Sequence, residues 1–376
     1  MNNPGEKCEA LSYVPLLFYL LHMPAPPNAP GRAARSNEAG RYERFSREAV
    51  DDGWEAEELP PLRTEVSEER PRKVITRNTS PDLSFDRSIN PYRGCEHGCI
   101  YCFARPSHAW LGLSPGLDFE TRLIARPEAP EILRRELAKP GYRPATIAIG
   151  TNTDPYQPIE KERRIMRGVL EVLSEHRHPV AVVTKGSLVE RDADLLGEMG
   201  QAGLARVGIS VTSLDPVLSR KMEPRCPGPK RRLRLIETLA KAGCPVRLMA
   251  SPMVPGLTDH ELEAILKAGR EAGAVAASTI PLRLPREVSA LWQDWLAEHY
   301  PERVGRVMSK LREMHGGRDY DSEWGKRMTG EGVWAELLQT RFRRAARELG
   351  LRETLPDLRR DLFKVPPRAG DQLTLF

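Results

Sequence analysis

The sequence predicts an α/β fold built on a mainly parallel sheet. From residue 84 onward, short apolar runs rich in β-branched residues alternate with longer amphipathic patterns. Successive apolar runs are spaced by roughly 30 residues, which leaves room for a helical crossover between parallel strands and far exceeds a hairpin turn. A hydrophobic content of 40% and a charged content of 29% are typical of a soluble globular protein.

Six strands are expected in this region. One precedes Cys95, and the others cover residues 146–150, 179–184, 205–211, 245–250 and 275–282. Helical patterns lie between them at residues 128–139, 161–177, 190–202, 229–243 and 258–273. Thr258 and Glu261 predict a capping box at the start of the last helix. The alternation fits both a partial barrel and a doubly wound open sheet.

The rest of the chain predicts three further parts. Residues 1–80 are rich in proline, glycine and both charges without apolar periodicity, so we expect an irregular or disordered N-terminal lead-in. The α/β domain covers residues 81–285, and amphipathic patterns after it predict a helical C-terminal extension over residues 286–363. Residues 364–376 read as a flexible tail that ends in QLTLF.

One strongly apolar run, residues 11–23, lies within the lead-in. At about 13 residues it is too short to cross a bilayer, which needs about 20, so we expect no membrane attachment. Its leading charges are balanced, unlike the basic start of a signal peptide. We therefore expect Met23 to be the true start, with residues 1–22 not translated.

Residues 93–103 hold three of the six cysteines, Cys95, Cys99 and Cys102, in the spacing C-x3-C-x2-C. Three thiolates so close in sequence can bind one soft metal centre. Gly94 and Gly98 precede the first two cysteines, where glycine permits a positive φ and a close approach of the backbone to that centre.

No fourth cysteine lies nearby, since the next is Cys226. Three cysteines on a cluster of four irons leave one iron open for chemistry, whereas a structural zinc site would need His97 or His108 as fourth ligand. The three-residue gap between the first two cysteines fits zinc poorly and favours the open cluster. Clustered cysteines without a disulfide pattern also indicate a reducing, cytoplasmic location.

The motif, with Tyr101 directly before its last cysteine, resembles the signature of the radical S-adenosylmethionine enzymes. The surrounding residues, SINPYRGCEHGCIYCFARPSHAWLGLSPGLDFETRL, resemble more narrowly the DNA-repair-photolyase-like branch related to spore photoproduct lyase. This resemblance implies a partial (β/α)6 TIM-like barrel. It also implies two cofactors, a 4Fe-4S cluster and S-adenosyl-L-methionine, whose reductive cleavage gives a deoxyadenosyl radical that abstracts hydrogen.

In such barrels the working residues follow the C-terminal ends of the strands. The segment GTNTDP stands where related enzymes carry a Gly-Gly-Glu-like element, so the resemblance puts Thr151, Asn152 and Asp154 near the cofactor's amino group. Lys185 resembles the lysine that pairs with the cofactor's carboxylate. Ser210 resembles the serine that bonds its ribose or carboxylate, and Tyr101 the aromatic residue beside its adenine.

Each of these residues also has a structural alternative. Lys185 would then be a solvated strand-end lysine, Ser210 and Asp154 would stabilise turns, and Tyr101 would pack under the loop. Of the two later cysteines, Cys244 is expected in the core. Cys226 lies in a loop on the expected active face and is a candidate radical relay.

Three kinds of partner are expected. The basic segment 220–234 suggests phosphate contacts with a nucleic acid, the alternative being a solvated surface. Gln372, Leu373, Leu375 and Phe376 resemble the peptide by which bacterial repair proteins dock on the sliding clamp. The resemblance further implies a reductant such as flavodoxin or ferredoxin.

The sequence leaves three functions open. The first is a radical enzyme that acts on a nucleic-acid-related substrate, as a DNA-repair lyase does. The second is a non-catalytic metal-cluster module that binds nucleic acid, and the third is a radical enzyme that acts on a small metabolite or peptide. Polar residues after successive strands favour an enzyme, because a binding module would not need them.

Overall fold

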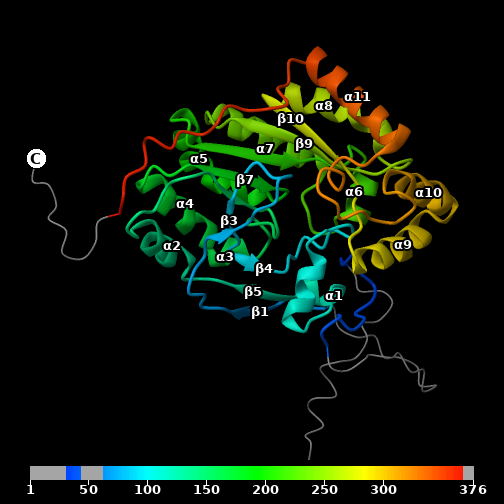
Figure 1. Cartoon of the computed structure of the whole chain (residues 1–376), viewed down its shortest axis with the longest axis horizontal. Helices are drawn as coiled ribbons and strands as arrows, with labels where there is room; N and C mark the ends of the chain where they lie inside the picture. The colour runs from blue at the N-terminus through cyan, green and yellow to red at the C-terminus, as the bar shows by residue number, and fades with distance from the viewer. Residues whose placement is uncertain (1–30, 44–61, 367–376) are drawn as a thin grey trace, which may run out of the picture.

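The computed structural model of the chain describes residues 31–43 and 62–366. Its main sheet has seven strands in the order β10-β9-β8-β7-β6-β3-β2 (Figure 1). Six are parallel, and their bounds are β3 (Arg87–Ile89), β6 (Ile147–Ile149), β7 (Val180–Thr184), β8 (Ala205–Ser210), β9 (Val246–Met253) and β10 (Ala276–Pro281). Within the described residues β10 does not pair with β2, so the barrel is partial, as expected.

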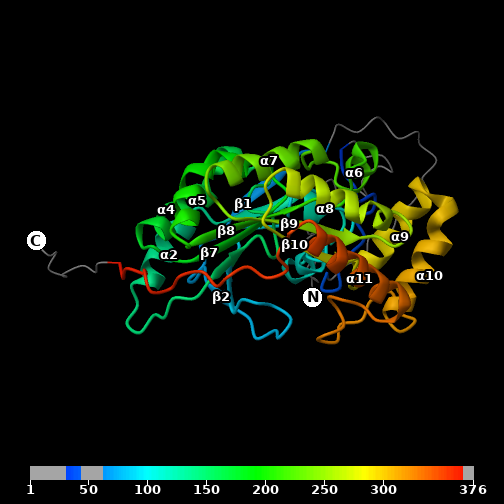
Figure 2. The same ribbon diagram turned by 90° about the horizontal axis from the view of Figure 1, so that it is seen from above.

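The crossovers contain the expected helices, which lie along one side of the sheet (Figure 2). They are α2 (Ala129–Leu137), α4 (Ile165–Glu175), α5 (Ala193–Gln201), α7 (Pro229–Lys241) and α8 (Leu262–Glu271). In α8 the buried residues Leu262, Ile265, Leu266 and Gly269 recur at the helical period and form the face that packs on β9. The single helix predicted over residues 161–177 is divided at Arg164, whose φ is 51°, into α3 (Glu160–Arg163) and α4. The short helix α6 (Pro216–Met222) was not predicted.

The predicted capping box is wrong. The Thr258 hydroxyl accepts a hydrogen bond from the backbone N–H of Val254, four residues earlier. The Glu261 carboxylate accepts from the N–H of Leu214 in another loop, and α8 begins only at Leu262. Both side chains therefore tie loops together instead of capping the helix.

A second, three-stranded sheet lies beside the cysteine loop in the order β1-β5-β4. It consists of β1 (Glu65–Glu68), β4 (Tyr92–Arg93) and β5 (Arg122–Ala125), and α1 (Leu117–Thr121) leads into β5. Together with β2 (Thr76–Arg77), β1 gives regular structure to a lead-in whose sequence showed no periodicity. Strands of two to four residues carry too few apolar positions for a pattern to reveal them.

The C-terminal extension contains α9 (Glu287–His299), α10 (Val304–Met314) and α11 (Gly332–Glu348). The segment that follows, residues 349–366, runs back past β10 and β8 towards α2 (Figures 1 and 2). Backbone hydrogen bonds join Arg352 to Val275 and Ala277, and two later residues of the segment to Gly203 and His176. The segment therefore crosses the N-terminal ends of β10, β8 and β7. We call this segment the C-terminal strap.

No helix among the described residues is long and apolar enough to span a membrane. The apolar run at residues 11–23 and the predicted clamp-binding residues Gln372, Leu373, Leu375 and Phe376 lie outside the described residues.

Candidate functional site

The cysteine loop follows β4 and turns sharply at two glycines. Gly94 and Gly98 have φ values of 74° and 64°, which confirms the positive φ expected from the sequence. A Cβ atom on Gly98 would lie 2.6 Å from a carboxylate oxygen of Glu120, and one on Gly94 would lie 2.6 Å from Leu123. The loop therefore needs glycine both for its conformation and for its packing.

Arg105 holds the loop from beneath. This fully buried guanidinium donates to the backbone carbonyls of Gly98 and Cys99, at 3.0 Å each, and to the Glu120 carboxylate at 2.5 Å. Glu120 also accepts from the backbone N–H groups of Ala33 and Ala34 in the lead-in. The cysteine positions are thus fixed by a buried ion pair rather than by the loop alone.

A cavity of about 180 Å³ opens between the cysteine loop and the C-terminal ends of the strands. Its lining residues include Cys99, Tyr101, Cys102, Lys185, Ser210 and Arg283. These side chains come from the loop and from the ends of β7, β8 and β10. The structure therefore brings five of the predicted site residues to one cavity, and Lys185 and Ser210 are the two that lie farthest in sequence from the loop.

Behind Tyr101 lies a buried polar network centred on Glu223. Its carboxylate accepts hydrogen bonds from the hydroxyls of Tyr101 and Thr212 and forms an ion pair with Arg232 on α7. Burial opposes ionisation, but Arg232 and Lys185 outweigh it and hold the pKa of Glu223 at about 2. Burial and the Glu223 charge raise the pKa of Tyr101 well above its usual value, so Tyr101 stays neutral. The network fixes the ring of Tyr101 in the cavity wall.

Lys185 extends into the cavity with its ammonium 5.8 Å from the centre of the Tyr101 ring. It has no carboxylate in ion-pair contact within the described residues. Burial lowers the pKa of Lys185, but the neighbouring Cys99 thiolate and Glu223 carboxylate together raise it by more. The pKa is therefore above its usual value and the ammonium stays charged. A buried ammonium without a direct counterion is well suited to bind an anionic group of a ligand.

Asp154, by contrast, is engaged with protein groups. Its carboxylate accepts from the Thr184 hydroxyl at 2.6 Å, the Lys185 N–H at 2.8 Å and His97 at 3.3 Å. Burial alone would raise its pKa, yet His97 lowers it to about 2. Thr151 and Asn152, half-buried on the same loop, make no side-chain hydrogen bonds to the described residues. Asp154 thus acts on Lys185 through the backbone, and Thr151 and Asn152 are left free for a ligand.

The donor set suits an iron–sulfur cluster. All three loop cysteines are free thiols, and burial with the negative charge of Cys99 and Cys95 raises the pKa of Cys102 to about 12. Among described residues no three Cys, His, Asp or Glu side chains are arranged to hold a single metal ion. His108 is buried under the loop against Phe119, where it bonds the Arg122 carbonyl at 2.9 Å. It is a packing residue in this structure, not a fourth ligand beside the cysteines.

The family model for the radical SAM superfamily matches residues 89–268, which span the cysteine loop and the strands up to α8. The chain belongs to the radical SAM superfamily.

The chain is also similar to proteins of known sequence or structure. An uncharacterized protein of Mycobacterium tuberculosis is 38% identical over 232 residues, which cover 61% of this chain and 68% of the relative. A probable GTP 3',8-cyclase of Thermococcus kodakarensis is 25% identical over 232 residues, or 60% of this chain and 68% of the relative. The structure of a spore photoproduct lyase variant with bound AdoMet superposes with a TM-score of 0.55 and 16% identity, covering 77% of this chain and 80% of that one.

Four residues of this radical SAM enzyme's site were missed by the sequence reading. Glu223 is the only acidic residue in the basic segment 220–234, a signal that could have identified it, but its partner Arg232 looked like one more surface charge. Arg283 follows β10, so the strand-end rule applied to the last strand would have found it. Exposed Phe103 lies directly after the motif, with the Arg283 guanidinium 4.8 Å from its ring centre.

The basic segment is less available to a partner than its sequence suggested. Arg225 pairs with Glu96, Arg231 with Glu190, and Arg232 with Glu223. The remaining basic residues of the segment are Arg220, Lys221, Lys230 and Arg234. Cys226 lies in the same segment with its sulfur 3.8 Å from that of Cys99, so it is beside the cysteine loop and not in the solvent. The predicted core position of Cys244 is confirmed by its 2% exposure.

Proposed function

We propose that the chain binds a 4Fe-4S cluster through Cys95, Cys99 and Cys102 and S-adenosyl-L-methionine in the adjacent cavity. The proposal extends to hydrogen abstraction from a nucleic-acid-related substrate. The observation that carries it is the cavity itself: two of the three loop cysteines, an ammonium without a direct counterion and the ends of three strands converge on it. When bound, the cluster supplies one electron that splits S-adenosylmethionine and yields the deoxyadenosyl radical.

Each cavity residue then has a definite task. Lys185 binds the carboxylate of the methionine moiety, because its ammonium lines the cavity beside Cys99 and Cys102 and lacks a described acid in ion-pair contact. Asp154 orients Lys185 by accepting from its backbone N–H. Thr151 and Asn152 do not line the cavity, but they directly follow Gly150, which does, and they are free to accept from the amino group. Ser210 and Tyr101 line the cavity and would face the nucleoside. Burial of these groups excludes water from the radical.

Arg283 supports an anionic substrate. Its guanidinium lines the cavity, and its pKa is lowered by burial. It donates to the Met328 sulfur at 3.0 Å and also interacts with Tyr320, but no described carboxylate lies in ion-pair contact with it. A guanidinium without a carboxylate partner is suited to bind a phosphate group. The aromatic ring of Phe103 beside it could stack on a nucleic-acid base.

A small nucleotide is the second candidate substrate. The likeness to the probable GTP 3',8-cyclase of Thermococcus kodakarensis supports it. Both candidates share a phosphate near Arg283, and they differ in the salt dependence of binding. A polyanion that contacts several cations would lose affinity steeply with salt, whereas a mononucleotide would not.

The proposal is tested by anaerobic reconstitution with iron and sulfide, followed by dithionite and S-adenosylmethionine. We expect deoxyadenosine to form with the wild-type chain and to fall to background in Cys95→Ala. Cys244→Ala is the matched control, because Cys244 is a buried cysteine near the opposite ends of the strands. Deoxyadenosine at the wild-type rate from Cys95→Ala would contradict the cysteine assignment.

A further inference from the structure

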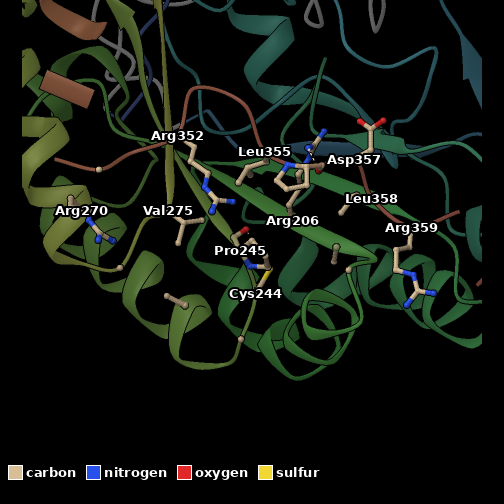
Figure 3. Close-up of a pocket in the computed structure, with 17 residues that line it drawn as sticks. Arg206, Cys244, Pro245, Arg270, Val275, Arg352, Leu355, Asp357, Leu358 and Arg359 are labelled. Carbon is tan, nitrogen blue, oxygen red and sulfur yellow. Dashed lines mark hydrogen bonds between the residues drawn. The ribbon is translucent and has the colours of Figure 1, made fainter. Parts of the chain in front are cut away.

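A second and larger cavity lies at the N-terminal ends of the same strands. It has a volume of about 620 Å³ and is enclosed by the residues that precede β8, β9 and β10 and by the C-terminal strap (Figure 3). Pockets that bind small molecules in proteins usually have volumes of about 300 to 1,000 Å³. Arg206 and Ser210 stand on the same face of β8, four residues apart, so the two cavities are separated by about 13 Å of strand.

Four arginines line this cavity, and three of them lack an acid. Arg359 pairs with Asp361, and the lining carboxylate of Asp357 pairs with Arg360. Within the described chain, no carboxylate forms an ion pair with any of the other three, which are Arg206, Arg270 and Arg352. The Asp357 carboxylate acts on Arg206 without forming an ion pair with it, and an anionic ligand would supply the direct counterion that all three guanidiniums lack.

Arg352 is the freest of the three. Its backbone is anchored to β10, with its N–H bonding the Val275 carbonyl at 3.1 Å, while its side chain makes no hydrogen bond to described residues. Figure 3 shows the Arg352 side chain pointing from the strap into the cavity, over Pro245 and Val275. Arg270 lies to one side of it and Arg206 to the other. Arg206 and Arg270 donate only to backbone carbonyls.

The remaining wall is apolar. Val275, Leu355, Leu358 and Pro245 line it, and Val275 is 38% exposed although it is a large aliphatic residue directly before a strand. A ligand with an apolar body would cover this surface and gain about 25 cal/mol for each Å² removed from water. The cavity thus combines an anion-binding group with an uncovered apolar wall.

We infer that this cavity binds a small organic anion, with a phosphate or carboxylate group held by Arg352 and an apolar body against Val275 and Leu355. A guanidinium presents two parallel N–H donors that match either oxyanion. Arg206 and Arg270 add positive potential on both sides and thereby strengthen the binding. This site is separate from the cysteine cavity, so it does not depend on the proposed function.

The test is isothermal titration calorimetry of the full chain without added nucleotide. The probes are phenyl phosphate, benzoate, inorganic phosphate and neutral phenol. We expect saturable binding of phenyl phosphate or benzoate, at least about tenfold tighter than that of phenol or of inorganic phosphate. Whichever of phenyl phosphate and benzoate binds more tightly shows whether the site prefers a phosphate or a carboxylate group.

Three variants test whether the probes bind in this cavity. Arg352→Ala should weaken phenyl phosphate or benzoate at least about tenfold. Val275→Trp should do the same by filling the cavity without a change of charge. Arg344→Ala should bind like the wild type, because Arg344 pairs with Glu348 on the exposed face of α11. Thermal melts accompany each titration to establish that the variants are folded.

Three results would overturn the inference. One is the absence of saturable heat up to about 10 mM of either charged probe. Another is equal affinity in Arg352→Ala and Arg344→Ala. The third is binding that disappears in Lys185→Ala but survives in Arg352→Ala, since the probe would then occupy the cysteine cavity.

Discussion

The arginines at the two ends of the parallel strands differ in whether they are paired with a carboxylate. At the C-terminal ends, Arg232 and Arg105 are fully buried, and each faces a buried carboxylate, Glu223 or Glu120. At the N-terminal ends, Arg206 and Arg352 are half-buried or exposed and donate at most to backbone carbonyls. Arg232 and Arg105 are thus neutralised by carboxylates of the described residues, whereas Arg206 and Arg352 have no described carboxylate in ion-pair contact.

The difference indicates what each end is built to do. Buried, hydrogen-bonded pairs hold side chains in one geometry, as the cysteine loop and Tyr101 require if a reactive radical is to be directed. Unpaired arginines around an open cavity fix nothing in place and are available to a ligand. Lys185 and Arg283 are the exceptions at the C-terminal end, because neither has a described carboxylate in ion-pair contact, and we therefore expect both to bind ligand groups directly.

The largest expected difference between the two ends of the strands is the effect of losing a cysteine on iron content. Cys99→Ala removes a proposed cluster ligand, so we expect iron to fall from about four atoms per chain to a small fraction of that after reconstitution. Cys244→Ala, at the other end, should retain full iron. Iron and sulfide analysis of the desalted proteins measures this, and full iron in Cys99→Ala would remove that residue from the ligand set.

Breaking a buried pair should cost more than breaking an exposed one. Glu223→Gln leaves Arg232 buried without a counterion, and we expect a loss of about 3 to 5 kcal/mol in the free energy of unfolding. Glu348→Gln, which breaks the exposed pair with Arg344, should cost less than about 1 kcal/mol. Urea unfolding of both variants measures the two losses, and similar midpoints would show that the Glu223 network does not stabilise the fold.

The N-terminal ends contain a buried histidine that should make stability depend on pH. His178 precedes β7, bonds the Pro179 carbonyl and accepts from the Tyr142 hydroxyl at 2.8 Å, so it is neutral in the folded protein. Burial lowers its pKa to about 4, below its usual value near 6.5. The unfolded chain therefore takes up a proton first as the pH falls.

The stabilisation from His178 should accordingly be complete above about pH 6.5 and decline by up to about 3 kcal/mol as the pH falls to 4. In His178→Gln the glutamine amide keeps one donor and one acceptor but does not titrate. The free energy of unfolding should therefore change less between about pH 6.5 and pH 4 than it does in the wild type. Unfolding curves at several pH values measure the slope. Identical slopes in both proteins would contradict the assignment of a buried neutral imidazole.

The smallest of these effects concerns Lys185. Lys185→Ala should retain the cluster but raise the Kd for S-adenosylmethionine about tenfold, because one charge-assisted hydrogen bond is lost. Lys241→Ala, which removes an exposed lysine paired with Glu237, should leave that Kd unchanged. Equilibrium binding under anaerobic conditions provides the comparison, and an unchanged Kd in Lys185→Ala would mean that the lysine does not contact the cofactor.

Local signals in the sequence predicted the parts of the molecule that local physics determines. The strands between residues 146 and 282 were found because their apolar runs are long, and the turns at Gly94 and Gly98 because few other residues adopt their φ. The position of Lys185 and Ser210 in one cavity followed from the rule that parallel strands end at the same edge.

Features that depend on distant partners were not predictable in this way. Glu223 and Arg232 pair only because α6 and α7 pack behind Tyr101, and a basic segment gives no indication of which charge will be buried. Thr258 and Glu261 match a capping box in sequence, yet other loops take both side chains. Strands β1, β4 and β5 form through pairing across more than 20 residues, which no local pattern records.

The central claim is that three cysteines hold a cluster with one iron left open to S-adenosylmethionine. The most direct measurement is electron paramagnetic resonance of the reconstituted, dithionite-reduced protein before and after addition of that nucleotide. We expect a reduced 4Fe-4S signal whose g values change on addition. A signal that is unaffected by saturating S-adenosylmethionine, or a chain that takes up zinc and no iron, would contradict the account.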